Sequence, residues 1–121
     1  MLFRSLAYFE HPDYVPLLLR ARDLWRDLER DTGTSLLTEC GLVSAGPAAG
    51  GVITGTLASA RRHGLPVESL TAREVTARWP ALAVPDEWTA VFERQAGHLA
   101  VERCVRAHAA IAARQIGRAH V

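Results

Sequence analysis

The sequence contains no lysine, and all 14 of its basic residues are arginines. No Schiff base and no lysine general base can therefore come from this chain. Apolar residues make up 49% of its 121 residues, yet no apolar run approaches the roughly 18–20 residues that a membrane-spanning helix needs. The net charge of +1 leaves no basic excess of the kind that binds nucleic acid. The composition is typical of one ordinary globular domain, and it predicts neither a membrane nor a nucleic acid as a partner.

Cysteine is scarce as well. Cys40 and Cys104 lie far apart and form no disulfide pattern, so we expect two buried, small apolar side chains in a reducing cytoplasm. A secretory signal is missing, because residues 1–3 are followed by Arg4 and soon by acidic residues. These features predict a cytoplasmic location.

Several motifs that would identify an active site are also missing. There is no G-x-S-x-G for a serine hydrolase, and the glycines at 46, 50 and 51 fit neither G-x-G-x-x-G nor a P-loop. A dinucleotide cradle is therefore absent from the sequence. No histidine pairs with another histidine or a cysteine at ligand spacing, so no metal site is predicted. The histidines are His11, His63, His98, His108 and His120.

The remaining polar and aromatic residues have ordinary structural explanations. The carboxylates Asp23 and Asp27 alternate with Arg26 and Arg30, which indicates a solvated helix face and not a pair of glycosidase acids. The tryptophans and one histidine fall at positions that helix or strand periodicity assigns to packing. We therefore expect core positions for Trp25, Trp79, Trp88 and His108.

Hydrophobic periodicity predicts an α+β fold, with about four helices interleaved with short strands. The clearest helix begins at Pro12-Asp13 and ends at Thr32-Gly33, and it buries Tyr14, Leu18, Ala21, Trp25 and Leu28. The last helix, over residues 102–115, has an apolar stripe of Val101, Cys104, Val105, His108, Ile111 and Ala112. Between these helices we expect first a strand pair, or one strand bent at Gly41, over residues 36–45, and then a helix over residues 52–63 that Gly64 ends. A strand over residues 67–70 and a short helix that begins with a Thr71–Glu74 capping box should follow. The last expected elements before the final helix are a strand over residues 88–94, in which Trp88, Ala90 and Phe92 alternate with other residues, and a short extended segment over residues 98–101.

Five segments in order carry a resemblance to a known family. They are AYFEHPDYVPLLLRARDLWRDLE (7–29), TECGLVSAGP (38–47), ASARRHGLPVESLTAREVTARWPAL (58–82), VPDEWTAVFERQAGHL (84–99) and ERCVRAHAAIAAR (102–114). Together they resemble the FAD-dependent amine oxidases that include sarcosine oxidase and N-methyltryptophan oxidase. The resemblance implies part of a two-domain flavoenzyme, in which a Rossmann-type FAD domain is interrupted by a substrate domain.

The resemblance also implies a reaction. In that family, FAD oxidises a secondary amine or an N-methyl amino acid to an imine, and O₂ then takes the electrons and becomes hydrogen peroxide. The implied partners are therefore a small amine or amino-acid substrate, O₂, and the remainder of the enzyme, which would hold the FAD. The fragment alone is expected to be inactive.

The resemblance implies that two residues, Arg4 and Tyr8, lie beside the substrate or the cofactor. In relatives an arginine shortly before the A-Y pair binds the carboxylate or lies beside the flavin; here Arg4 is the candidate, one residue further from Tyr8 than in R-x-A-Y. Residues 9–12 are implied to lie near the active-site entrance. The lysine and the cysteine that act on O₂ and flavin in relatives lie downstream, so neither Cys40 nor Cys104 takes such a role.

The predicted domain organisation follows from the same resemblance. Residues 1–115 are expected to be a partial oxidoreductase domain that lacks the Rossmann glycine segment. Residues 116–121, IGRAHV, look like a translated sequencing adapter and are expected not to belong to the fold. The alternative is a non-catalytic α+β module that binds a partner protein.

Overall fold

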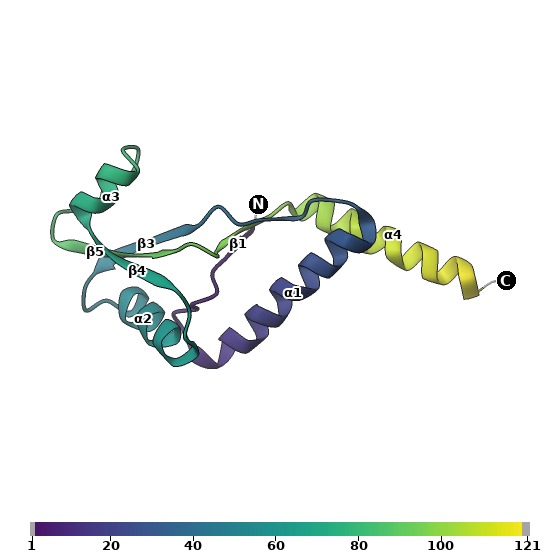
Figure 1. The fold of residues 1–121 in the computed structure, drawn as a ribbon, viewed down its shortest axis with the longest axis horizontal. Helices are drawn as coiled ribbons and strands as arrows, with labels where there is room; N and C mark the ends of the chain where they lie inside the picture. Colours follow the sequence, from purple (N-terminus) through teal and green to yellow (C-terminus); the bar gives the residue numbers. More distant parts are fainter. Residues whose placement is uncertain (1, 120–121) are drawn as a thin grey trace.

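The computed structural model describes residues 2–119, and side chains are described for residues 5–117. These residues form two three-stranded antiparallel sheets. In Figure 1 the sheet with the longer strands lies at one end, helix α4 extends to the other end, and helix α1 runs between them. The elements are β1 (Leu2–Arg4), the 3₁₀ helix η1 (Pro12–Tyr14), α1 (Val15–Thr32), β2 (Leu37–Thr38), β3 (Leu42–Pro47), α2 (Gly51–His63), β4 (Val67–Thr71), α3 (Ala72–Arg78), β5 (Trp88–Glu93), β6 (Gly97–Leu99) and α4 (Val101–Ala119).

The long-strand sheet has the order β3-β5-β4, with every neighbouring pair antiparallel. Helices α2 and α3 pack against the central strand β5. The core of this half contains Leu70, Val75, Ala90 and Phe92. Because β5 has a neighbour on each edge and a helix on each side, four consecutive residues from Ala90 to Glu93 are buried, in place of the simple alternation that the sequence predicts.

The short-strand sheet has the order β1-β6-β2 and is covered by α1 and α4. Its core contains Leu28, Leu36, Leu37, Leu99, Cys104 and Ala107. The two sheets are joined directly by the chain, since β2 continues into β3 and β5 continues into β6. Gly41 makes the first of these connections with a φ of 84°, a conformation that favours glycine, and its N–H donates to the carbonyl of Ala96 in the second connection (2.8 Å).

Helix α1 ends where its sequence predicts but begins later, at Val15, because the predicted start at Pro12-Asp13 forms the 3₁₀ helix η1, which is capped by His11. Pro16 lies in the first turn, where the missing N–H has no intrahelical partner, and Gly33 closes the helix in the left-handed region (φ 64°). Beyond that end, Glu29 Oε1 accepts hydrogen bonds from the N–H groups of Leu36 (2.7 Å) and Leu37 (2.8 Å). The helix therefore fixes the start of β2 through one carboxylate.

Other predicted elements are also confirmed. Helix α2 stops at Gly64 in the left-handed region, and α3 begins with the capping box of Thr71 and Glu74. The segment predicted as a strand pair or a bent strand forms two strands, which join different sheets. The overall class, α+β with four α-helices in the described residues, agrees with the prediction.

Several predicted core positions are wrong. Helix α4 packs along the narrow line of Cys104, Ala107 and Ile111, and this rotates Val105 and His108 into solvent. Trp88 is 37% exposed because it begins its strand, and Tyr14 is 51% exposed at the start of α1. Cys40 is exposed in the turn between β2 and β3, although Cys104 is buried as expected. Within residues 2–119, no helix is long and apolar enough to cross a membrane.

Candidate functional site

The coil of residues 5–11 contains Tyr8 and connects β1 to the first helical turn. Hydrogen bonds from two directions fix its backbone. Glu93 of β5 accepts from the N–H groups of Leu6 (3.0 Å) and Ala7 (2.9 Å), and Ser59 Oγ of α2 donates to the carbonyl of Tyr8 (2.6 Å). The coil is therefore attached to the long-strand sheet and to its covering helix, although the strand before it belongs to the other sheet.

A glycine in α2 allows the close approach of this coil. A Cβ atom at Gly55 would overlap the carbonyl of Phe9, so no other residue type fits there without a shift of the backbone. Ser59, one turn further along α2, is fully buried and makes the hydrogen bond to Tyr8 described above. The sequence Gly55-x-x-x-Ser59 thus places a small residue and a hydroxyl on the helix face that meets the coil.

The ring of Tyr8 is half-buried and lies in an aromatic group. Its centroid is 5.3 Å from that of Tyr14, with the rings edge to face, and 5.8 Å from that of Phe9. The phenol hydrogen-bonds to the Glu10 carboxylate, and this bond, with burial and the negative charge of Glu10 adding to it, raises the pKa of Tyr8. The phenol therefore stays protonated at neutral pH, and its one O–H is donated to Glu10.

The other predicted site residue is only partly placed. The backbone of Arg4 lies in β1, opposite Gly97 of β6. Its side chain lies outside the described side chains. Arg4 and Tyr8 are therefore shown to lie on one continuous segment, four residues apart, and their side-chain relationship stays a prediction.

Residues 9–12, predicted to lie near an entrance, are at the surface. Phe9 is 41% exposed, and His11 Nδ1 accepts from the N–H of Asp13 (3.2 Å) as the cap of η1. Asp13 also forms an ion pair with Arg62 of α2 (3.2 Å). The segment is exposed yet anchored at its far end.

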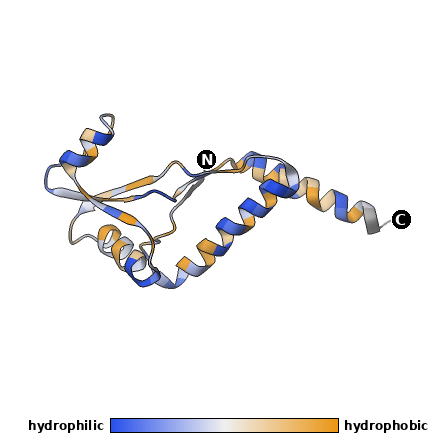
Figure 2. Ribbon diagram, in the orientation of Figure 1, coloured by the Kyte–Doolittle hydropathy of each residue, from blue (hydrophilic) through white to orange (hydrophobic). Residues whose placement is uncertain are grey.

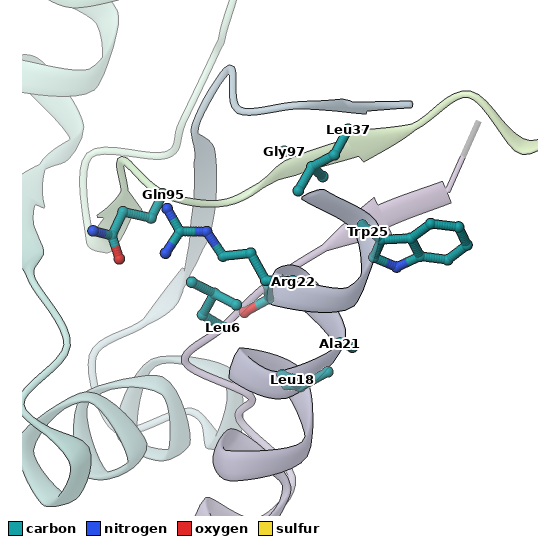
Figure 3. Close-up of a pocket in the computed structure, with 9 residues that line it drawn as sticks. Leu6, Leu18, Ala21, Arg22, Trp25, Leu37, Gln95 and Gly97 are labelled. Carbon is teal, nitrogen blue, oxygen red and sulfur yellow. The ribbon is translucent and has the colours of Figure 1, made fainter. Parts of the chain in front are cut away.

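A small pocket with a cavity volume of about 20 Å³ lies on the other side of the coil, between it, α1 and β6, and is partly open to solvent (Figure 3). Ser5 and Leu6 of the coil form one wall. Most of the lining is apolar, and Arg22 extends across the pocket toward Gln95 (Figure 3). The lining residues are Ser5, Leu6, Leu18, Ala21, Arg22, Trp25, Leu37, Gln95 and Gly97.

The glycine-rich turn between β3 and α2 uses the N–H of Gly50 within the turn itself. The N–H of Gly50 donates to the carbonyl of Pro47 (2.8 Å), so it is used inside the turn, and Pro47 itself has no N–H to offer. A Cβ atom at Gly50 would meet that same carbonyl, which shows that the glycine serves the tight turn and not a phosphate. The N–H of Gly50 is therefore not free to bind a phosphate. The described side chains also contain no group of three His, Cys, Asp or Glu that could hold a metal ion.

Sequence reasoning did not find the residues that hold the coil. Glu93 was visible only as an acidic residue at the end of an apolar strand, and Ser59 and Gly55 as small residues in a helix. A charged residue in a run that is otherwise apolar was the one available signal, because burial of a carboxylate requires hydrogen-bond donors nearby.

Comparison with known families agrees with the fold and the five sequence segments. The family described as FAD dependent oxidoreductase (DAO) matches residues 1–120. The chain belongs to this family. FAD is the cofactor of the family, and the predicted resemblance is confirmed.

The chain is 41% identical over 100 residues to the N-methyl-L-tryptophan oxidases of Yersinia pestis (strain Pestoides F) and Yersinia pseudotuberculosis serotype O:1b (strain IP 31758). The match covers 83% of this chain and 27% of each relative, so the chain spans about a quarter of their length.

Solved structures give the same result. A mutant of NikD in its open form, described as an unusual amino acid oxidase essential for nikkomycin biosynthesis, superposes with a TM-score of 0.76 at 25% identity, over 87% of this chain and 27% of NikD. Glycine oxidase from Geobacillus kaustophilus gives 0.54 at 26% identity, over 71% and 25% of the two chains. Nothing in these comparisons supports the alternative of a non-catalytic binding module.

Proposed function

We propose that this chain is one part of an FAD-dependent oxidase that converts a secondary amine or an N-methyl amino acid to an imine, with formation of hydrogen peroxide. The observation that carries the proposal is the 41% identity over 100 residues to N-methyl-L-tryptophan oxidase. Structural similarity to two amino acid oxidases supports it independently. FAD supplies the oxidation when it is bound, and O₂ is the oxidant of the family reaction.

In this proposal the coil of residues 5–11 faces the substrate or the cofactor. Tyr8 offers a protonated phenol on a backbone that is fixed at three points, by Glu93, Ser59 and the contact with Gly55. Arg4, four residues earlier, provides the guanidinium that can bind a substrate carboxylate with two parallel hydrogen bonds. The dinucleotide of FAD is held by protein outside this chain.

The proposal includes the predicted organisation of the chain. Residues 1–115 are the part that belongs to the oxidase, and residues 116–121 are a tail unrelated to its fold. Helix α4 continues into this tail as far as Ala119. The predicted cytoplasmic location remains part of the proposal.

A chimeric enzyme tests the function. The matching 100-residue segment of the Yersinia pestis relative is replaced by the corresponding segment of this chain. We expect the purified chimera to retain FAD and to form peroxide with N-methyl-L-tryptophan, sarcosine or another N-methyl amino acid. A folded chimera that binds FAD but forms no peroxide with any secondary amine would contradict the proposal.

The same chimera tests the role of the coil. Tyr8→Phe removes only the phenol oxygen, and Tyr14→Phe makes the same chemical change in the neighbouring, more exposed ring. We expect the first substitution to lower kcat/KM and the second to leave it unchanged. Equal kinetics for both variants would remove Tyr8 from the site.

A further inference from the structure

A buried carboxylate lies behind the candidate site and holds the coil on which that site depends. Glu93 is the last residue of β5 and is only 4% exposed. Its Oε1 accepts from the hydroxyl of Ser5 (2.6 Å), and its Oε2 accepts from the N–H groups of Leu6 and Ala7. Three donors from three consecutive residues thus converge on one side chain.

This arrangement determines the direction of the coil. In an extended strand, consecutive N–H groups point to opposite sides, so two of them can meet one oxygen only where the backbone turns. The turn comes directly after β1 ends at Arg4. A charged acceptor forms shorter and stronger hydrogen bonds than a neutral one. In a buried position each donor also has little access to water or to another acceptor.

The residues held by Glu93 are those on which the candidate site depends. Ser5 and Leu6 form a wall of the pocket between the coil and α1. Ala7 is followed directly by Tyr8, whose carbonyl is fixed by Ser59 on the opposite side. From Glu93 the chain passes within four residues to Gly97, which lines the same pocket and pairs with Arg4 in the short-strand sheet.

We infer that Glu93 is a positioning residue of the oxidase: it touches neither substrate nor cofactor, and it sets the placement of Arg4 and Tyr8 by fixing the turn between them. The inference deepens the proposed function and rests on it for its catalytic meaning. The geometric part, that the turn depends on this carboxylate, stands on the structure alone.

Amide hydrogen exchange on the complete 121-residue chain tests the geometric part. Glu93→Gln keeps the size of the side chain but replaces one acceptor oxygen with an NH₂ group, which would face a donor. Glu87→Gln is the matched control, since Glu87 is exposed. We expect the amides of Leu6 and Ala7 to exchange about tenfold faster or more in Glu93→Gln, as the loss of a charge-assisted hydrogen bond implies. The control should leave them unchanged.

The local pattern distinguishes positioning from general destabilisation. Amides of β3 and β4 should exchange at similar rates in the Glu93→Gln variant and the unmodified chain. Unchanged protection of Leu6 and Ala7, or an equal acceleration across the whole long-strand sheet, would overturn the inference. If Glu93→Gln does not fold, Ser5→Ala removes only one of the three donors and should accelerate the same two amides by a smaller factor; no acceleration there would also overturn it.

The chimera described above provides the catalytic readout. Glu93→Gln should raise KM or lower kcat while the FAD content stays that of the parent chimera, and Glu93→Asp, which keeps the charge, should recover part of the loss. If the parent chimera forms no peroxide, the proposed function fails and the exchange data still decide the role of the turn. If the chimera is active and Glu93→Gln matches Glu87→Gln in both constants, the positioning role alone fails.

Discussion

The two sheets differ in strand length and in how completely their helices are covered. Strands β3, β4 and β5 have five or six residues each, whereas β1, β2 and β6 have two or three. The helices over the short-strand sheet also leave large apolar side chains in solvent, with Leu17 67%, Val105 63% and Ile116 60% exposed. Figure 2 shows hydrophobic positions along both of these helices.

The difference indicates where stability resides. A three-stranded sheet with strands of five or six residues, a buried central strand and helices packed against it can be stable without contacts to the rest of the chain. The short-strand sheet depends on a narrow contact seam between α1, α4 and Leu99. The coil with Tyr8 begins in the weaker sheet but is held by the stronger one, through Glu93 and Ser59. The candidate site therefore takes its rigidity from the long-strand half.

The largest expected effect comes from the core of the short-strand half. Leu99→Ala removes a side chain that is 1% exposed and central to that cluster. We expect a loss of about 2–5 kcal/mol in the free energy of unfolding, because burial is lost and a cavity remains. Leu17→Ala on α1, at 67% exposure, is the control and should change stability by no more than about 0.5 kcal/mol. If urea denaturation gave both variants a similar loss in the free energy of unfolding, the exposed face of α1 that carries Leu17 would be covered in solution, and the prediction would be wrong.

The attachment of the coil to the long-strand half is tested at α2. In Gly55→Ala the new methyl group would overlap the carbonyl of Phe9, and the coil must move away from the helix. We expect a cost of about 1–3 kcal/mol. Gly51→Ala, in the same helix with no atom within 4 Å of its Cβ, should cause no loss. A neutral Gly55→Ala in thermal unfolding would show that the coil does not lie against α2.

A smaller effect is expected at the start of α3. Thr71 Oγ1 accepts from the N–H of Glu74 (3.3 Å), and the Glu74 carboxylate accepts from the N–H (2.7 Å) and the hydroxyl (2.9 Å) of Thr71. The two bonds that the carboxylate accepts lower the pKa of Glu74. Thr71→Ala should cost about 1 kcal/mol, while Ser69→Ala, exposed on the strand before it, should stay within about 0.5 kcal/mol. Denaturant titration of the two variants checks this, and equal values would argue against the capping box.

The smallest effect is a pH dependence in the short-strand half. Arg22 donates to Glu39 (2.7 Å) and this bond lowers the pKa of Glu39, although partial burial opposes it. A lowered folded-state pKa means that the stabilisation is present above the unfolded value of about 4.3 and is lost as the pH falls through the folded value. Arg22→Met should therefore cost less than about 1 kcal/mol at pH 7, and the difference from the unmodified chain should shrink toward pH 3. A difference that is unchanged at pH 3 would assign the effect to packing.

Most helices and their ends could be predicted, because the signals are local. Gly33 and Gly64 end their helices in the left-handed region, and the Thr71–Glu74 spacing marks the start of α3. The face of α4 could not be predicted in the same way. Because α4 is rich in alanine, several of its faces are almost equally apolar. Cys104 and Ala107 form the packed face only because they meet Leu36 and Leu99 in the folded chain.

The candidate site was predictable in part. The resemblance placed Tyr8 in a functional segment, and the structure shows how that segment is held, but the partners are far away in sequence. Glu93 is 86 residues from Ala7, and Ser59 is 51 residues from Tyr8. Periodicity within a window of ten or twenty residues contains no information on such contacts, so they could only be seen once the chain was folded.

The central claim is that this chain supplies part of an oxidase whose FAD is bound by other protein. Bound flavin, measured by visible absorption after FAD incubation and desalting, tests it most directly when the isolated chain and the chimera are compared. The account predicts stoichiometric FAD in the chimera and none in the isolated chain. A yellow isolated chain with stoichiometric FAD would contradict it.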